Sequence, residues 1–253
     1  MINTVAEVSL IALTSLYTNI PCEDVFVAAA RKEIPAKRLQ QETPFLRKLA
    51  VESCKTSNPD IVWQIAKVET NFNFTILRIN HDARVHQGET AVNYLRLLKK
   101  SGRRVNLDIG AMQLNWYWHR QWFNNDPIKM MDPAMQVRYL VTKLSPSLKK
   151  HCRNEWVGCY HNPANGKRAR IYNRANRVAR KRLERAVLRI LATKTNPMPP
   201  LKPLVLSQKQ IIRIYDVARN ARYQVVLTYL PPKHLLAMFE KPVRRSELKF
   251  RMH

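Results

Sequence analysis

The sequence predicts an all-α, mainly helical protein, and three observations support that prediction. Apolar residues recur at helical spacing in several successive segments. Helix-start signals, above all Asn58-Pro59-Asp60, precede these segments. No stretch alternates apolar and polar residues as a half-buried strand would. We therefore expect a chain that folds almost entirely into helices.

The first clear helix begins at Asn58-Pro59-Asp60. This sequence combines an N-cap residue, a proline at the first helical position and an acid in the first turn. Helical spacing is then seen in the apolar residues Ile61, Ile65, Val68 and Phe72.

Further helices are expected along the chain. Residues 89–100 form an amphipathic segment that Gly102 should terminate. Asp132-Pro133 opens a helix whose apolar stripe runs from Val137 to Leu144. A fourth element surrounds residues 156–160, and a very basic fifth runs from about residue 168 to residue 191.

A proline-rich segment, residues 195–203, interrupts the helical pattern because proline cannot continue a helix. We expect this segment to link a main domain, residues 50–194, to a basic C-terminal extension over residues 204–253. Ser207 is the expected cap of a helix in that extension. Residues 1–49 form either an N-terminal helical extension or an export segment.

The composition is strongly basic. Lys and Arg total 44 against 18 Asp and Glu, which gives a formal net charge of +26. Such a surface attracts polyanions such as nucleic acid, anionic lipid or bacterial cell wall. The alternative is a solvated basic face without a specific partner. The chain has only 5 glycines, which disfavours a glycine-rich nucleotide loop.

The four cysteines form no Cys-x-x-Cys pair, which disfavours a zinc ribbon or a thioredoxin motif. Their even number allows disulfides if the protein is exported. The sequence leaves open whether Cys22 pairs with Cys54 or with one of the later cysteines, Cys152 and Cys159.

Glu69 is the first candidate for chemistry. It follows Ile65 by four residues, so it lies at the margin of the apolar face of its helix. A carboxyl group there loses hydration, which favours its neutral form. A protonated carboxylic acid can cleave a glycosidic bond by protonating the leaving oxygen. A surface glutamate at a helix end is the alternative.

Three signatures then follow in order along the chain. They are Val68-Glu69-Thr70, the segment Gly110-Ala111-Met112-Gln113-Leu114-Asn115, and Cys159-Tyr160-His161. In these the chain resembles the lytic transglycosylase family, which is related to goose-type lysozyme. The family signatures are a helix ending in Glu-Ser, then Gly-x-Met-Gln-x-Asn, then Ala-Tyr-Asn. Flanking segments look like small members that accompany secretion, conjugation and pilus machines, and the resemblance covers roughly residues 50 to 190.

The resemblance implies a lysozyme-like transglycosylase domain over residues 50–194, with short helical extensions on both sides. Glu69 matches the catalytic acid and base. Thr70 takes the place of the family's serine and keeps a hydroxyl near the reaction centre. Gln113 and Asn115 match substrate-contacting positions.

The resemblance also assigns residues around the expected cleft. Met112 would pack below the cleft floor. Tyr160 matches a tyrosine that holds the catalytic glutamate or the sugar's acetamido group, and ordinary core packing is the alternative for both residues. His161 replaces the family's asparagine. Tyr172, which follows the third signature, completes the expected substrate-binding set.

The family mechanism uses one glutamate, and no second acid occupies a matching motif position. Asp108 is the nearest candidate, but the family's aspartate there looks structural. The implied substrate is the bond between N-acetylmuramic acid and N-acetylglucosamine in peptidoglycan, and the implied product is a 1,6-anhydro sugar. Neither a metal nor a cofactor is expected. The resemblance further implies location in the bacterial periplasm or cell envelope and partners in an envelope-spanning machine.

Three other functions compete with this interpretation. The arginine-rich segment around Tyr172 could grip a nucleic-acid backbone, which we disfavour because the catalytic signatures lie beside it. The other two are a scaffold protein that has lost activity and a muramidase that uses water.

The C-terminal extension is a candidate for docking to a partner or to a membrane surface. The aromatic cluster of residues 116–118, 122 and 123 is expected to line the cleft in part, with at least half of its rings in the core.

Overall fold

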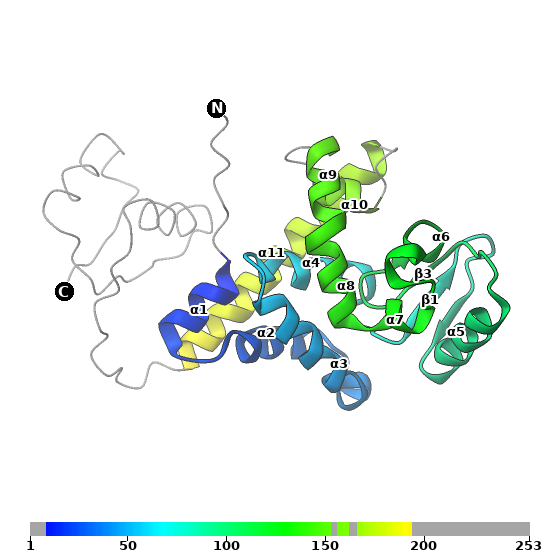
Figure 1. Cartoon of the computed structure of the whole chain (residues 1–253). Helices are drawn as coiled ribbons and strands as arrows, with labels where there is room; N and C mark the ends of the chain where they lie inside the picture. Colours follow the sequence, from blue (N-terminus) through cyan, green and yellow to red (C-terminus); the bar gives the residue numbers. More distant parts are fainter. Residues whose placement is uncertain (1–8, 153–155, 162–165, 194–253) are drawn as a thin grey trace, which may run out of the picture. The chain divides into compact units, whose positions relative to one another are not determined.

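The computed structural model describes residues 9–152, 156–161 and 166–193, and most of them are helical, as the sequence predicts (Figure 1). Contacts along the chain separate residues 1–195 from residues 196–253, and the first of these units is compact. All described residues belong to the first unit. The predicted linker over residues 195–203, the C-terminal extension and the helix expected at Ser207 lie outside the described residues.

The secondary-structure elements follow one another in a regular order. The helices are α1 (Leu10–Thr18), α2 (Cys22–Arg31), α3 (Ala36–Cys54), α4 (Pro59–Thr70), α5 (Glu89–Ser101), α6 (Trp116–His119), α7 (Pro127–Met131), α8 (Pro133–Tyr139), α9 (Ser145–Cys152), α10 (Trp156–His161) and α11 (Gly166–Thr193). A 3-10 turn, η1 (Arg120–Phe123), follows α6, and a π-helical turn, η2 (Leu140–Leu144), joins α8 to α9. The strands are β1 (Ile76–Ile79), β2 (Val85–Gln87), β3 (Leu107–Ile109) and β4 (Leu114–Asn115).

The helix boundaries predicted from capping signals are confirmed. The Asn58 side chain accepts a hydrogen bond from the Ile61 amide at 3.3 Å, with a proline at the first position of α4. Asp132 caps α8 by accepting from the amides of Ala134 and Met135. Gly102 ends α5 in the left-handed conformation.

The expectation of an almost purely helical chain was wrong for one region. Strands β1 to β4 form an antiparallel sheet in the order β2-β1-β3-β4. These strands are two to four residues long, too short to display the alternation by which a strand is recognised in a sequence. Figure 1 shows this sheet and α5 on one side of α8, with α1 and α2 on the other.

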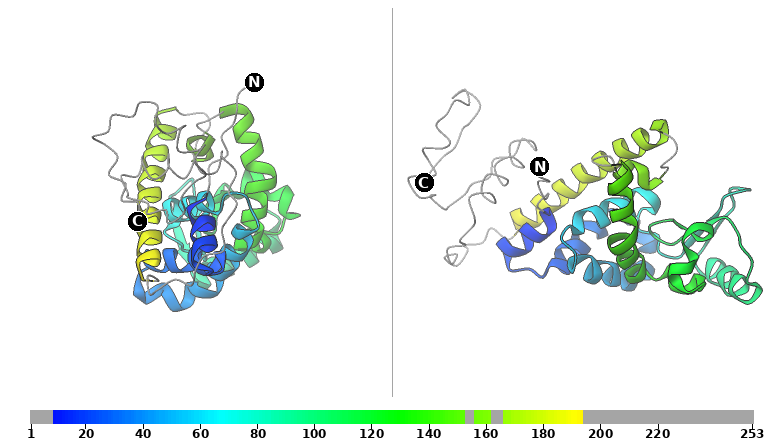
Figure 2. Two further views of the ribbon diagram at one scale, coloured as in Figure 1. Left: turned by 90° about the vertical axis from the view of Figure 1, so that its left-hand side faces the viewer. Right: turned by 45° about the horizontal axis from the view of Figure 1, so that its top comes forward.

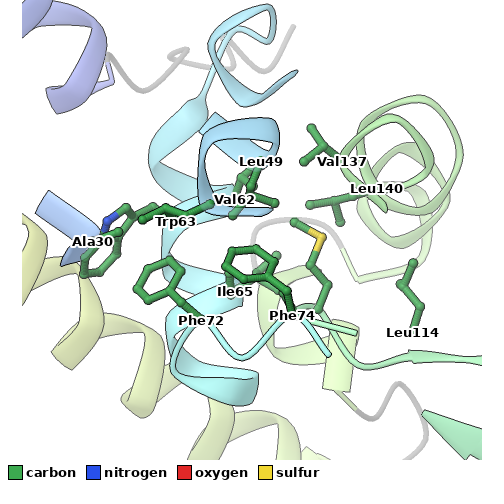
Figure 3. Close-up of a cluster of buried hydrophobic side chains, with 14 of the residues drawn as sticks. Ala30, Leu49, Val62, Trp63, Ile65, Phe72, Phe74, Leu114, Val137 and Leu140 are labelled. Atoms are coloured by element: carbon green, nitrogen blue, oxygen red, sulfur yellow. The ribbon is translucent and has the colours of Figure 1, made fainter. Parts of the chain in front are cut away.

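Helix α4 lies at the centre of the helical packing, in contact with α1, α2, α3 and α11. Figure 3 shows its buried side chains Val62, Trp63 and Ile65 within the core cluster, with Leu49 of α3 and Val137 of α8 nearby. These contacts hold α4, whose last two residues are Glu69 and Thr70, at the centre of the helical packing.

The beginning of α1 is tied directly to α4. The buried carboxylate of Asp60 accepts hydrogen bonds from the Ser9 hydroxyl and the Leu10 amide, both at 2.6 Å, and from the Ile11 amide at 3.0 Å. These donors belong to the first turn of α1 and would otherwise lack partners within that helix. One aspartate therefore anchors the N-terminal helix on α4.

All four cysteines form disulfides. Cys22 pairs with Cys54, which links the start of α2 to the end of α3. Cys152 pairs with Cys159, which links α9 to α10. These pairs settle the connectivity that the sequence left open. Separately, none of the helices in the described ranges has the length and apolar character required to cross a membrane.

Candidate active site

Glu69 is the penultimate residue of α4, and its side chain is 10% exposed. Its carboxylate oxygen Oε1 lies 3.8 Å from Nδ1 of His161, the last residue of α10. That distance allows an ion pair, although it is too long for a hydrogen bond. The surface-glutamate alternative does not fit this burial, and Glu69 keeps enough exposure to meet a substrate.

Thr70 connects the end of α4 to the loop that begins at Gly110. Its hydroxyl lies 3.0 Å from the carbonyl oxygen of Ala111 and 3.3 Å from that of Ala66, and it accepts from the Asn73 amide at 3.2 Å. The hydroxyl is therefore occupied by backbone groups. These contacts make Thr70 a positioning residue for the segment around Glu69.

The peptide groups of Met112 are held from both sides. The Tyr160 hydroxyl donates to the Met112 carbonyl oxygen at 2.5 Å. The Met112 amide donates to the side-chain oxygen of Gln136 at 3.1 Å. The Met112 side chain itself is fully buried, which agrees with packing beneath the loop. The second and third sequence signatures are thus joined by a hydrogen bond.

Gln136 of α8 holds the rest of this loop. Its amide nitrogen donates to the carbonyl oxygens of Ile109 and Met130, at 2.7 and 2.8 Å. Gly110 packs so closely on this side chain that an added Cβ atom would lie 2.4 Å from the amide nitrogen of Gln136, and its φ is +75°. Both the close approach and the positive φ require glycine at the start of the loop.

Two aromatic rings complete the surroundings of Glu69. The His161 ring stacks on Tyr172 of α11, with centroids 5.0 Å apart and planes tilted by 5°. Tyr160 lies against the same tyrosine at 6.2 Å. The Tyr172 hydroxyl is buried, and it lies close enough to Glu69 for the carboxylate to add to the rise in the tyrosine pKa that burial causes.

The charges of this group influence one another. The Glu69 carboxylate raises the pKa of His161, while burial opposes the shift. Desolvation raises the pKa of Tyr160 and of Tyr172, and Glu69 adds to both effects. Both tyrosines therefore remain neutral hydrogen-bond donors at physiological pH.

Asp108 and Asn115 lie opposite each other in the pairing of β3 with β4. The Asn115 amide donates to a carboxylate oxygen of Asp108 and to the side-chain oxygen of Asn106, both at 2.8 Å. Burial raises the pKa of Asp108, although this hydrogen bond from Asn115 opposes the shift. The structural role expected for Asp108 fits this arrangement. Asn115 also caps α6, so its side chain is engaged within the protein.

Gln113 has a positive φ of 48°, and its side-chain amide donates to the Gly110 carbonyl oxygen at 2.9 Å. The loop is therefore closed by its own side chain. Gln113 remains partly exposed, whereas Met112 beside it is buried. Of the two, Gln113 is the residue that a substrate could contact.

The aromatic cluster after Asn115 divides between core and surface, and whether its exposed rings line a cleft stays a prediction. Trp116 and Phe123 are buried, and Trp122 packs on Phe123. Tyr117 and Trp118 are exposed, with Trp118 at 72%. A pocket of about 240 Å³ lies at this place, lined by Leu98, Lys99, Gly102, Arg104, Trp116, Arg120, Gln121 and Asn125.

The structure brings Glu69, Tyr160, His161 and Tyr172 into one group, and Thr70 and Met112 support it through backbone contacts. Sequence reasoning missed Gln136. The signal was a glutamine one residue before Val137 in an otherwise apolar helix stripe, and an amide at a core position must find partners.

No protein-family model, curated protein or solved structure matches this chain. Within residues 9–152, 156–161 and 166–193, no three His, Cys, Asp or Glu side chains are grouped so that they could hold a metal ion. The functional interpretation therefore depends on the residues themselves.

Proposed function

We propose that this protein is a peptidoglycan lytic transglycosylase with a lysozyme-like catalytic domain, and that Glu69 is its catalytic acid and base. One observation carries the proposal. The three sequence signatures, which are separated along the chain, contact one another, and the third lies against the Glu69 carboxylate. Thr70 contacts the Ala111 carbonyl, Tyr160 contacts the Met112 carbonyl, and His161 faces Glu69.

The chemistry requires one carboxyl group in two protonation states. Protonated Glu69 donates its proton to the oxygen that links N-acetylmuramic acid to N-acetylglucosamine, and the bond from the anomeric carbon to this oxygen breaks. The acetamido group of the substrate stabilises the electron-poor anomeric carbon. Glu69, now a carboxylate, removes the proton from the 6-hydroxyl, whose oxygen bonds to the anomeric carbon. The product is a 1,6-anhydro sugar, and no water is consumed.

His161 departs from the family's asparagine and introduces a second titrating group. Glu69 raises the pKa of His161, because a nearby carboxylate favours the charged imidazolium. After the first proton transfer, Glu69 carries a negative charge that a protonated His161 stabilises at 3.8 Å. The stacking of His161 on Tyr172 keeps the imidazole at this place.

The basic surface suits the proposed substrate. Peptidoglycan carries stem-peptide carboxylates, and a cationic protein accumulates on such a polymer. The same reasoning supports location in the cell envelope, where the two disulfides would be stable. Association with an envelope-spanning machine is part of the proposal, and its support is the resemblance of the flanking segments.

The first prediction is tested by digesting purified peptidoglycan with the wild-type protein and with Glu69→Gln. We expect anhydro-muropeptides from the wild type and at least about a hundredfold lower release by the variant, because general acid catalysis contributes on that scale. Mass spectrometry of the released fragments measures both. Glu89→Gln is the matched control, since Glu89 is an exposed glutamate in the first turn of α5.

Other outcomes would contradict parts of the proposal. Fragments with reducing ends would identify a muramidase that adds water. Absence of release by the folded wild-type protein would favour a scaffold or binding protein. Equal activity of Glu69→Gln and the wild type would remove Glu69 from the mechanism.

A further inference from the structure

A basic pocket lies where the later turns of α11 meet the turn between α2 and α3. Its volume is about 290 Å³, which is several times the roughly 30 Å³ of one water molecule. The lining is strongly polar and consists of Lys32, Glu33, Arg182, Arg185, Ala186 and Arg189. None of these residues belongs to the candidate active site. Figure 2 shows the later turns of α11 passing α1 and α2.

The pocket has one wall that is a regular face of α11. Arg182, Arg185, Ala186 and Arg189 are spaced by three, one and three residues, which places them on one side of the helix. Ala186 is 8% exposed, and its small side chain leaves room between the guanidinium groups. The three arginines are exposed, so their donors are accessible from solvent.

Glu33 is the only acidic residue in the lining of this pocket, and its carboxylate already forms ion pairs within the protein. Its carboxylate pairs with Lys67 of α4 at 2.6 Å and with Arg182 at 3.0 Å. Burial acts to raise the pKa of Glu33, but the hydrogen bonds and charges of these two cations outweigh it and lower the pKa. Glu33 therefore stays ionised and serves to fix the Arg182 side chain.

The other cations of the pocket have no such partner. In the described part of the chain, Lys32, Arg185 and Arg189 form no ion pair with a carboxylate. Three positive charges thus face a common space, and no carboxylate among the described residues pairs with any of them. Like charges at this spacing repel one another, and an anion in the pocket would relieve that repulsion.

We propose that this pocket binds the phosphate group of an anionic ligand. The guanidinium group of arginine presents parallel N–H donors that match phosphate oxygens. A phosphate also carries up to two negative charges, which would partly neutralise the three cations that have no carboxylate partner among the described residues. A carboxylate offers one charge and only two oxygens. The volume accommodates a phosphate together with part of the molecule that bears it.

The pocket is separate from the group around Glu69. Arg182 follows Tyr172 by ten residues, which corresponds to about 15 Å along a helix. Lys67 and Glu69 stand two residues apart on α4 and point in different directions. The inference therefore does not depend on the reaction proposed for Glu69.

The test is isothermal titration calorimetry of the full-length protein with pyrophosphate at constant ionic strength. The pocket variant is Arg185→Gln with Arg189→Gln. The matched control is Arg174→Gln with Arg177→Gln, which removes the same charge from exposed positions of α11 outside the pocket. Both variants substitute exposed residues, and circular dichroism checks that both are folded.

We expect saturable binding by the wild type and at least about a tenfold loss in the pocket variant, since two charge-assisted hydrogen-bonding groups are removed. The control variant should lose less than about twofold. Glu69→Gln should bind pyrophosphate as the wild type does, which separates this inference from the proposed enzyme activity. Equal losses in the two double variants, or no saturable binding by the wild type, would overturn the proposal.

A second arm identifies the source of the phosphate. The protein is sedimented with phosphatidylcholine vesicles that contain or lack phosphatidic acid. The ligand is a lipid headgroup if the wild type binds the acidic vesicles, the pocket variant does not, and pyrophosphate displaces the bound protein. Pyrophosphate binding without vesicle binding indicates a soluble phosphate ligand. A third outcome would overturn the proposal. If the protein bound oligonucleotides but not pyrophosphate, and both double variants lost oligonucleotide binding equally, the diffuse positive charge of the surface would explain the binding and the pocket would not.

Discussion

Gln136 of α8 binds both ends of the 109–112 loop, at the Ile109 carbonyl oxygen and the Met112 amide. It forms three hydrogen bonds to backbone groups in a fully buried setting. Gln136→Leu keeps a similar volume but leaves the Met112 amide and two carbonyl oxygens without partners. We expect the free energy of unfolding to fall by about 3 kcal/mol, since an unsatisfied buried polar group costs about 1 to 3 kcal/mol. Chemical denaturation measures this change.

The exposed Gln121 provides the control for that substitution. Gln121→Leu removes the same amide group where water can replace it, so we expect a change within about 0.5 kcal/mol. If the two variants were equally stable, the hydrogen bonds of Gln136 would not be what holds the loop.

At the scale of single residues, the position of Glu69 in the helical repeat predicted its partial burial, which the structure confirms, whereas its proposed catalytic role came from the resemblance of the three signatures. It did not predict that the Thr70 and Asn115 side chains would be engaged with the protein itself. A motif gives the residue type at a position, whereas hydrogen-bond partners depend on the direction of the side chain in three dimensions. Gln136 was missed for the same reason.

At the scale of elements, the packing of α10 on α11 places Tyr160 and His161. Gly158 allows this packing, because an added Cβ atom would lie 2.6 Å from the side-chain nitrogen of Asn173 and 2.7 Å from the backbone oxygen of Ala169. A backbone atom cannot move aside without shifting the helix. The α10–α11 contact therefore depends on a residue without a side chain.

We expect Gly158→Ala to lower the free energy of unfolding by about 1 to 3 kcal/mol, the usual cost of overpacking. Hydrogen exchange of the α10 amides should accelerate, and the proposed peptidoglycan cleavage should decrease with it. Gly166→Ala is the control, since a Cβ atom there meets only the Arg170 side chain at 3.6 Å. Unchanged exchange in α10 of the Gly158 variant would contradict this account.

Elements with strong local signals were predicted well, and elements without them were not. The start of α4 and the end of α5 are determined by Asn58 and Gly102, which act within their own turns. The strands gave no such signal, because their pairing joins residues far apart, such as Arg78 with Asp108. Short strands are specified by their neighbours in space more than by their own pattern.

At the scale of the whole unit, the Cys22–Cys54 disulfide closes a larger loop than Cys152–Cys159, with sequence separations of 32 and 7. In the loop-closure description the larger loop stabilises the fold more, by about 3.7 kcal/mol against about 2.4 kcal/mol. We therefore expect Cys22→Ala with Cys54→Ala to destabilise the fold more than Cys152→Ala with Cys159→Ala. Denaturant titration of both double variants compares them, and the reverse order would refute the expectation.

The cysteine pairing illustrates what a sequence leaves undetermined for a whole molecule. Four cysteines allow three connectivities. The choice depends on α2 packing against α3, which is a tertiary contact. The same limit applied to the pocket on α11, where Lys32 and Arg189 are more than a hundred residues apart and meet only in the folded unit.

The contact of Glu69 with α10 and α11 has a consequence for the order of events during synthesis. His161 follows Glu69 by 92 residues and Tyr172 follows it by 103. A ribosome, working from the N-terminus, therefore delivers the carboxyl group long before its partners, and chain growth continues for several seconds in between. A chain synthesised only as far as α4 carries Glu69 without the His161 and Tyr172 side chains, so the proposed site is complete only after α11 has been made.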